Sequence, residues 1–154
     1  MTSEQFKSLL QELAHVARGD AAELVEHGRV QIGNLKALLA HDPAYEAELL
    51  QIRMLLGNMP TQEQELIAKA LLEANYVSGY GGECVFSLMP DTDDVVLTLK
   101  YRLHDALTPQ DLWQELSDIA ENGGRMWEAI LASAQPLAEA PAQMPSLLMG
   151  QAAV

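Results

Sequence analysis

The stretch from Pro60 to Phe86, PTQEQELIAKALLEANYVSGYGGECVF, constrains the fold more than any other part of this chain. Apolar residues recur in it at helical spacing, which predicts an amphipathic helix of about four turns. Thr61 and Gln64 have the spacing of a capping box, so we expect the helix to begin there. Glycines between residues 79 and 82 then permit a sharp turn. Alternating side chains over residues 84–89 predict a strand directly after that turn.

A hairpin gives the clearest strand signal in the sequence. Residues 84–89 and residues 95–102 each place successive side chains on alternating faces, and the acidic turn at 90–93 separates them. This pattern predicts two paired antiparallel strands.

Three shorter strands are expected earlier in the chain. Residues 30–32, 35–40 and 50–54 are separated by short turns, which favours an antiparallel meander. The middle segment, LKALLA, is ambiguous because its residues suit a helix equally well by propensity. Asp42–Pro43 is expected to interrupt the chain, since proline fixes φ and lacks an amide donor.

Helices are expected at both ends of this arrangement. Residues 3–18 carry one apolar stripe behind a capping box at Thr2, and Gly19 is placed to end that helix. A last helix is expected from Thr108–Pro109 to about residue 134. Gly123–Gly124 interrupts it at a cost of roughly 1 kcal/mol per glycine relative to alanine.

The predicted order is therefore α-βββ-α-ββ-α. Helices segregated from a mainly antiparallel, twisted sheet indicate the α+β class. Residues 1–134 are expected to form one domain, and 49% hydrophobic composition is ample for its core. Residues 135–154 are rich in proline and alanine and are expected to be a flexible tail, with Leu147–Met149 as an alternative docking segment.

Charge restricts the class of partner. The net charge of −13 disfavours nucleic acid and anionic membranes, and it suits a basic or apolar polypeptide. The alternative is that the excess of acid serves solubility alone.

One cysteine rules out an internal disulfide and is consistent with a reducing compartment. No apolar run is long enough to span a membrane and no signal peptide is recognisable, so we expect a cytoplasmic protein.

The sequence offers little catalytic chemistry. Its four histidines lack the spacing of a helical metal pair, and no second cysteine accompanies Cys84. Cys84 alternates with apolar residues, which favours a small buried hydrophobe over a nucleophile. The glycines at 79–82 follow a helix and precede a strand, the reverse of a phosphate-binding loop. We expect neither an enzyme nor a cofactor or metal.

Two segments carry a resemblance to a known family. LLEANYVSGYGGECVFSL followed by DDVVLTLKYRLHDALTPQDLWQELSDIAENGGRMWEAI resembles the small type III secretion chaperones of the CesT (Tir chaperone) family. The shared features are a Leu-Leu-x-x-Asn helix end, a Gly-Gly turn, two strands, a Leu-Thr-Pro link and a long last helix. Residues 4–134 are covered by the resemblance.

The resemblance implies a homodimer whose second helix and following strand form the interface. The matching interface positions are Leu66, Ala70, Leu71, Leu72, Tyr76, Val85 and Phe86. It also implies apolar patches from the first helix and first three strands, to which an extended client segment adds as a strand. The matching client-binding positions are Phe6, Leu10, Leu13, Val30, Ile32, Leu38, Leu50 and Ile52.

The implied function is that of a bacterial cytoplasmic chaperone. It would hold an extended, N-terminal segment of one or more type III secreted effectors in a secretion-competent state, and components of the secretion apparatus are further candidate partners. The alternative is a dimeric regulatory or adaptor module of similar fold that binds a folded protein.

Overall fold

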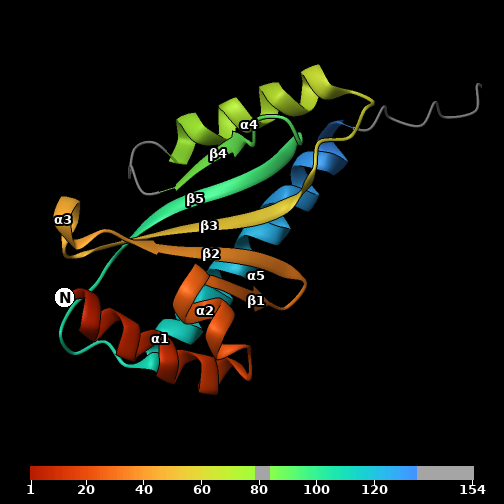
Figure 1. The fold of residues 1–154 in the computed structure, drawn as a ribbon. Helices are drawn as coiled ribbons and strands as arrows, with labels where there is room; N and C mark the ends of the chain where they lie inside the picture. Colours follow the sequence, from red (N-terminus) through yellow and green to blue (C-terminus); the bar gives the residue numbers. More distant parts are fainter. Residues whose placement is uncertain (79–83, 135–154) are drawn as a thin grey trace, which may run out of the picture.

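A five-stranded antiparallel sheet forms the centre of the molecule (Figure 1). The computed structural model describes residues 1–78 and 84–134. The predicted glycine turn and C-terminal tail lie outside these residues. The elements are α1 (Ser3–Ala17), α2 (Ala21–His27), β1 (Arg29–Ile32), β2 (Leu35–His41), α3 (Pro43–Glu46), β3 (Leu49–Asn58), α4 (Gln64–Ser78), β4 (Cys84–Leu88), β5 (Asp94–Arg102) and α5 (Pro109–Ala134). The strand order is β1-β2-β3-β5-β4, which confirms the predicted α+β class.

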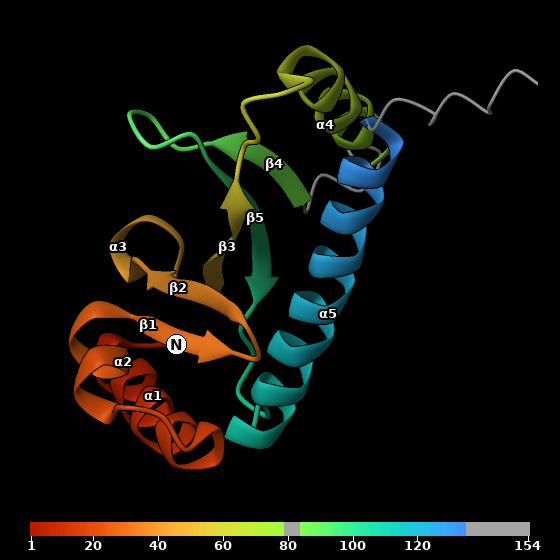
Figure 2. The ribbon, with the colours of Figure 1, turned by 90° about the vertical axis from the view of Figure 1, so that its right-hand side faces the viewer.

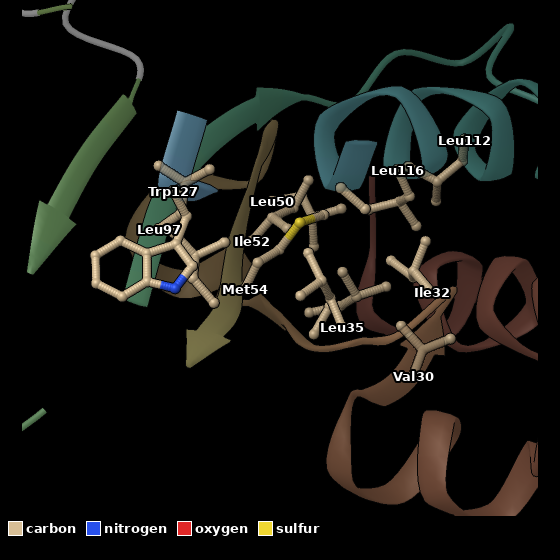
Figure 3. Packing of buried hydrophobic residues seen from close by; sticks show 14 of the residues in the cluster. Val30, Ile32, Leu35, Leu50, Ile52, Met54, Leu97, Leu112, Leu116 and Trp127 are labelled. Carbon is tan, nitrogen blue, oxygen red and sulfur yellow. The ribbon is translucent and has the colours of Figure 1, made fainter. Parts of the chain in front are cut away.

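The long helix α5 lies along one face of the sheet (Figure 2). Leu112 and Leu116 of α5 are fully buried and face side chains of β1 and β3 (Figure 3). The apolar stripe of α1 joins the same core, since Phe6, Leu10 and Leu13 are buried in one cluster with the α5 residues. The hydrophobic core therefore lies on one side of the sheet only.

The strand predictions are confirmed, including the ambiguous segment at 35–40. β2 pairs with β1 on one side and β3 on the other, and its side chains alternate between buried and more exposed positions. Local propensity did not distinguish a helix from a strand here, and the pairing of β2 with a strand on each side explains why the strand forms. β3 is longer than expected and contains a register shift between Leu55 and Gly57.

Two short helices were not predicted. In α2 the carboxylate of Asp20 accepts hydrogen bonds from the Ala22 and Glu23 amides at 2.8 and 3.2 Å, and Leu24 is its one buried residue. With one buried position in seven residues, α2 shows no helical repeat of apolar residues from which it could be predicted. Asp42–Pro43, predicted as a break, instead caps and begins the single turn of α3.

The helix ends show which cap predictions held. Thr2 and Gln5 form the expected capping box, with distances of 2.8 and 3.2 Å. Thr108 likewise accepts from the Asp111 amide at the start of α5. The capping box at Thr61 is wrong, because α4 begins at Gln64 and the Glu63 carbonyl accepts from the Ile67 amide at 3.0 Å. Arg18, not Gly19, adopts the left-handed conformation that ends α1.

Gly123 has a packing role inside α5. A Cβ atom at this position would lie 2.8 Å from Leu97 Cδ2 and 3.6 Å from Leu56 Cδ2, whereas one at Gly124 would meet nothing within 4 Å. The helix continues through both glycines to Ala134. Gly123 therefore permits the close approach of α5 to the sheet, and the helix propensity lost at this residue is offset by packing.

Candidate functional site

The two edges of the sheet differ in whether their outer backbone groups are already bonded. At the β4 edge, the Asn75 side chain of α4 accepts from the Phe86 amide at 2.7 Å and donates to the Phe86 carbonyl at 3.0 Å. This pair imitates the hydrogen bonding of a neighbouring strand. The middle of β4 is therefore closed by α4, which lies beside it in Figure 1.

The β1 edge remains available. The Leu39 amide donates to the Gly28 carbonyl at 2.8 Å, and Arg29 is opposite Leu38. In an antiparallel pair this arrangement turns the backbone N–H and C=O groups of Arg29 and Gln31 away from β2. Within the described residues no hydrogen bond occupies the backbone N–H or C=O of Gln31, whose side chain is exposed. β1 can accept one further strand on this side.

A groove of about 670 Å³ lies next to this edge. Its floor is the face of the sheet that points away from α5, which we call the open face. Leu38 of β2, Leu55 of β3 and Val96 of β5 provide the apolar floor, and the α1–α2 connection provides a wall. Arg29, Lys36 and Arg53 also line the groove. The open edge and the groove lie next to each other, an arrangement suited to an extended polypeptide.

Most of the predicted client-binding residues form the core instead of this surface. Leu38 is half-buried and lines the groove, and Val30 lines it while being 9% exposed. The other six are buried in the core that the sheet forms with α1 and α5: Phe6, Leu10, Leu13, Ile32, Leu50 and Ile52. The last three are labelled in Figure 3. A binding patch and a core require the same apolar side chains, so the sequence pattern did not separate them.

The predicted interface residues divide in the same way. Leu71 and Phe86 are buried at 6% and 4% exposure, and Ala70 is half-buried. The remaining predicted residues, Leu66, Leu72, Tyr76 and Val85, are all at least half exposed. Of nine exposed large hydrophobic side chains in the described residues, six belong to α4 and β4. Such a concentration marks an interaction surface.

Sequence reasoning missed the basic residues of the groove and the role of Asn75. Each strand has two sets of alternating side chains, and only the apolar set was treated as functional. Lys36 and Arg53 belong to the other set. Their position opposite Leu55 and Leu38 follows from the register between β2 and β3, which local sequence does not reveal. Asn75 gave a weak signal as a polar residue near a helix end.

Side chains that could ligate a metal do not cluster in the described part of the chain. No group of three metal-ligating side chains occurs there. Cys84 is half-buried, and burial raises the pKa of its thiol, which keeps the sulfur protonated and weakly nucleophilic. Across residues 1–78 and 84–134, none of the helices has the length and apolar character needed to cross a membrane.

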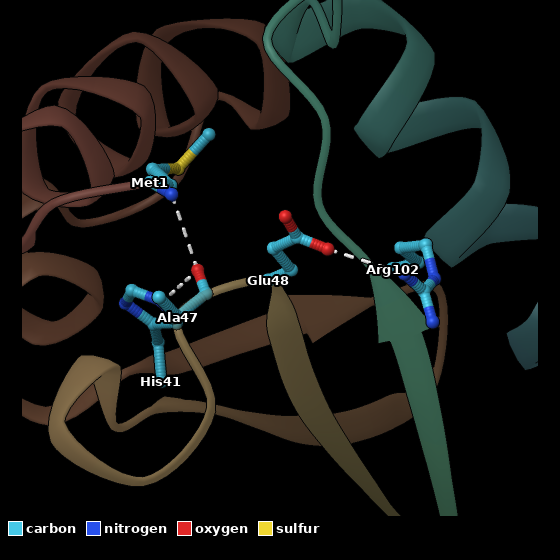
Figure 4. Close-up of polar contacts among 5 residues, drawn as sticks. All are labelled: Met1, His41, Ala47, Glu48 and Arg102. Atoms are coloured by element: carbon cyan, nitrogen blue, oxygen red, sulfur yellow. Dashed lines mark hydrogen bonds and ion pairs between the residues drawn. The ribbon is translucent and has the colours of Figure 1, made fainter.

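The polar contacts at the far end of the sheet serve structure. The N-terminal ammonium of Met1 donates to the Ala47 carbonyl at 3.2 Å, and His41 Nε2 lies 3.1 Å from the same oxygen (Figure 4). Arg102 pairs with Glu48 at 3.1 Å between exposed side chains. These contacts fix the start of the chain against the β2–β3 connection.

Similar folds occur in two solved complexes. A chain of the ExsC–ExsE complex is 16% identical with a TM-score of 0.62, and the match covers 83% of this chain and 95% of that one. A chain of the HopA1–SchA chaperone–effector complex is 17% identical with a TM-score of 0.56, covering 82% and 95%. At these identities the likeness shows the fold alone. No curated protein sequence in the comparison matches the chain.

A family model gives the assignment directly. The model of the Tir chaperone protein (CesT) family matches residues 8–121, well over half of the sequence, and the match includes the open edge, the groove and α4. The resemblance noted from the helix end, hairpin and last helix is thereby confirmed. The chain belongs to the Tir chaperone protein (CesT) family.

Proposed function

We propose that this protein is a cytoplasmic chaperone of type III secretion that binds an extended segment of one or more effectors and keeps it competent for export. Family membership supports this, as does a fold shared with a chain of a chaperone–effector complex. The observation that carries the proposal is the open edge at β1, placed beside an apolar groove. No catalytic step is part of the proposal.

Strand addition at β1 explains how the protein would bind varied clients. Backbone hydrogen bonds to the outward groups of Arg29 and Gln31 are independent of client sequence. A further stretch of the client, lying over the groove and not paired with β1, would be selected by its side chains, with Leu38 and Leu55 as apolar contacts. Because ordering a disordered segment costs about 2–5 kcal/mol or more, the client must make many contacts beyond the edge itself.

A test of this mechanism removes one backbone donor at the open edge. Co-expression with neighbouring reading frames from its own genome is expected to co-purify a client. Gln31→Pro eliminates an outward amide without touching the β1–β2 bonds, so client affinity should fall about tenfold or more. Gln31→Thr keeps the amide and should bind within about twofold of the wild type by calorimetry. Equal binding by both variants would favour a regulatory module that docks a folded partner elsewhere.

We further propose that the exposed apolar residues of α4 and β4 form the interface of a homodimer. Leu72 is 69% exposed on α4, and Val85 is 50% exposed on the adjoining strand. Two copies meeting through this surface would bury side chains that a monomer leaves in water. The β1 edge, at the other end of the sheet order, would stay free for the client.

Leu72→Glu is expected to convert the dimer to a monomer. A charge buried in an apolar interface typically costs at least about 2 kcal/mol, or roughly a 30-fold weaker dimer. Light scattering across a dilution series measures the change. Tyr45→Glu is the control, because Tyr45 is 87% exposed on α3, far from α4 in Figure 1. A monomeric wild type would refute the interface outright.

A further inference from the structure

The charges of this acidic protein are distributed unevenly over the sheet. The strands contain five of the nine Lys and Arg residues of the chain but one of its 22 acids, Asp94. The register of the four strand pairs places all five cations on the open face: Arg29, Lys36, Arg53, Lys100 and Arg102. A chain with a net charge of −13 therefore presents a basic surface next to its open edge.

Within the groove, cations and aliphatic side chains alternate in two directions. Lys36 of β2 is opposite Leu55 of β3, and two residues along, Leu38 is opposite Arg53. Directly opposed side chains have Cβ atoms about 5 Å apart, and same-face neighbours along a strand are about 7 Å apart. The four side chains thus lie at the corners of a rectangle, with the two cations on one diagonal and the two leucines on the other.

Among the described residues, the central cations of the open face form no ion pair. Of the four ion pairs in the described residues, two involve the open face: Arg29 pairs with Glu23 at 3.6 Å, and Arg102 with Glu48 at 3.1 Å. Lys36, Arg53 and Lys100 take part in none of the four. Arg53 donates to the neutral Gln51 side chain at 2.8 Å. Their charges are available to a ligand.

We infer that the groove takes a client segment in which acidic and apolar side chains alternate on one face of an extended chain. This inference rests on the proposed chaperone function and specifies its client. Same-face side chains of an extended segment repeat about every 7 Å, which matches the spacing of Lys36 and Leu38. Carboxylates of the segment would pair with Lys36 and Arg53, and its aliphatic side chains would pack on Leu38 and Leu55.

A polypeptide fits this surface better than a nucleic acid. The cations alternate with aliphatic side chains, so a polyanion would lose phosphate contacts at every second position. The net charge of −13 would also repel a long polyanion that extends past the groove. A short acidic-apolar segment meets favourable partners at each position and avoids that repulsion.

Short labelled peptides test the inference on the full-length protein. The probe repeats Leu-Ser-Glu-Ser, so that Leu and Glu share one face, and its counterpart has Gln in place of Glu. Fluorescence polarisation should show the Glu peptide binding about tenfold more tightly than the Gln peptide at low salt, a difference that salt diminishes. K36E and R53E should each abolish the preference. K7E, which makes the same charge change on the exposed face of α1, should retain it.

The outcomes separate this inference from the function on which it rests. Equal affinity for the Glu and Gln peptides, or an equal loss with K7E, overturns the inference. A co-purified client that binds K36E and R53E as tightly as the wild type overturns it while leaving the chaperone function intact. The expected peptide preference in a protein that captures no client would overturn the function instead. Displacement of the Glu peptide by a short oligothymidylate would assign the face to a polyanion and refute the proposal.

Discussion

Replacing Gly28 with alanine is expected to destabilise the protein by about 3 kcal/mol or more. Gly28 joins α2 to β1 with a φ of 69°, a region in which a Cβ atom costs roughly 1–2 kcal/mol. A Cβ atom there would also overlap the carbonyl oxygen of Leu39. Because that oxygen belongs to the backbone of β2, the overlap can be relieved only by moving the strand.

Gly33→Ala is the matched control for this prediction. Gly33 has a φ of 60°, but a Cβ atom at this position would meet nothing within 4 Å. Its substitution should therefore cost only the conformational term of roughly 1–2 kcal/mol. Urea unfolding of the two variants measures the difference. Equal losses of unfolding free energy in the two variants would show that β2 shifts at no cost. The close approach of Gly28 to Leu39 would then contribute nothing to stability.

Gly123→Val should destabilise the protein by about 1–3 kcal/mol, because it places new atoms where α5 meets the sheet. A Cβ atom there lies 2.8 Å from Leu97 Cδ2, and Leu97 is 2% exposed with little room to move. A branched side chain adds two further methyl groups at the same point. Either α5 moves outward or Leu97 leaves its rotamer.

Gly124→Val is the control that separates the effect of helix propensity on stability from the effect of packing. Nothing lies within 4 Å of a Cβ atom at Gly124, so this variant gains a little helix propensity and should change stability by less than about 0.5 kcal/mol. Thermal unfolding followed by circular dichroism compares the pair. If both variants were destabilised alike, the loss could not be assigned to the close approach of α5 to Leu97 at Gly123, and the prediction would be wrong.

The sequence predicted those elements whose signals are local. The hairpin of β4 and β5 was predicted because its alternation is complete within each strand, and the caps at Thr2 and Thr108 because capping residues lie within three positions of each other. α2 was missed because its single buried residue leaves no period. The expected cap at Thr61 failed because Glu63, with a φ of 59°, delays the helix start to Gln64.

The candidate site depends on relations that span the chain. Ile52 and Arg53 are neighbours in sequence, but one is buried against α5 and the other lines the groove. Alternation shows that β3 has two faces. It does not show which face α5 covers, since that depends on a helix more than fifty positions later. The strand order β1-β2-β3-β5-β4, which makes β1 an edge, is likewise set by long-range pairing.

The Asn75 side chain also determines how many copies of this chain can associate through their strands. A sheet with two open edges is a divalent monomer, and such monomers polymerise without limit. Closure of β4 at Phe86 leaves β1 as the edge at which one chain can pair with another, so strand pairing alone joins two chains at most. The same amide prevents a growing sheet from continuing through a single chain, and Asn75→Ala would open β4 at Phe86 to such growth.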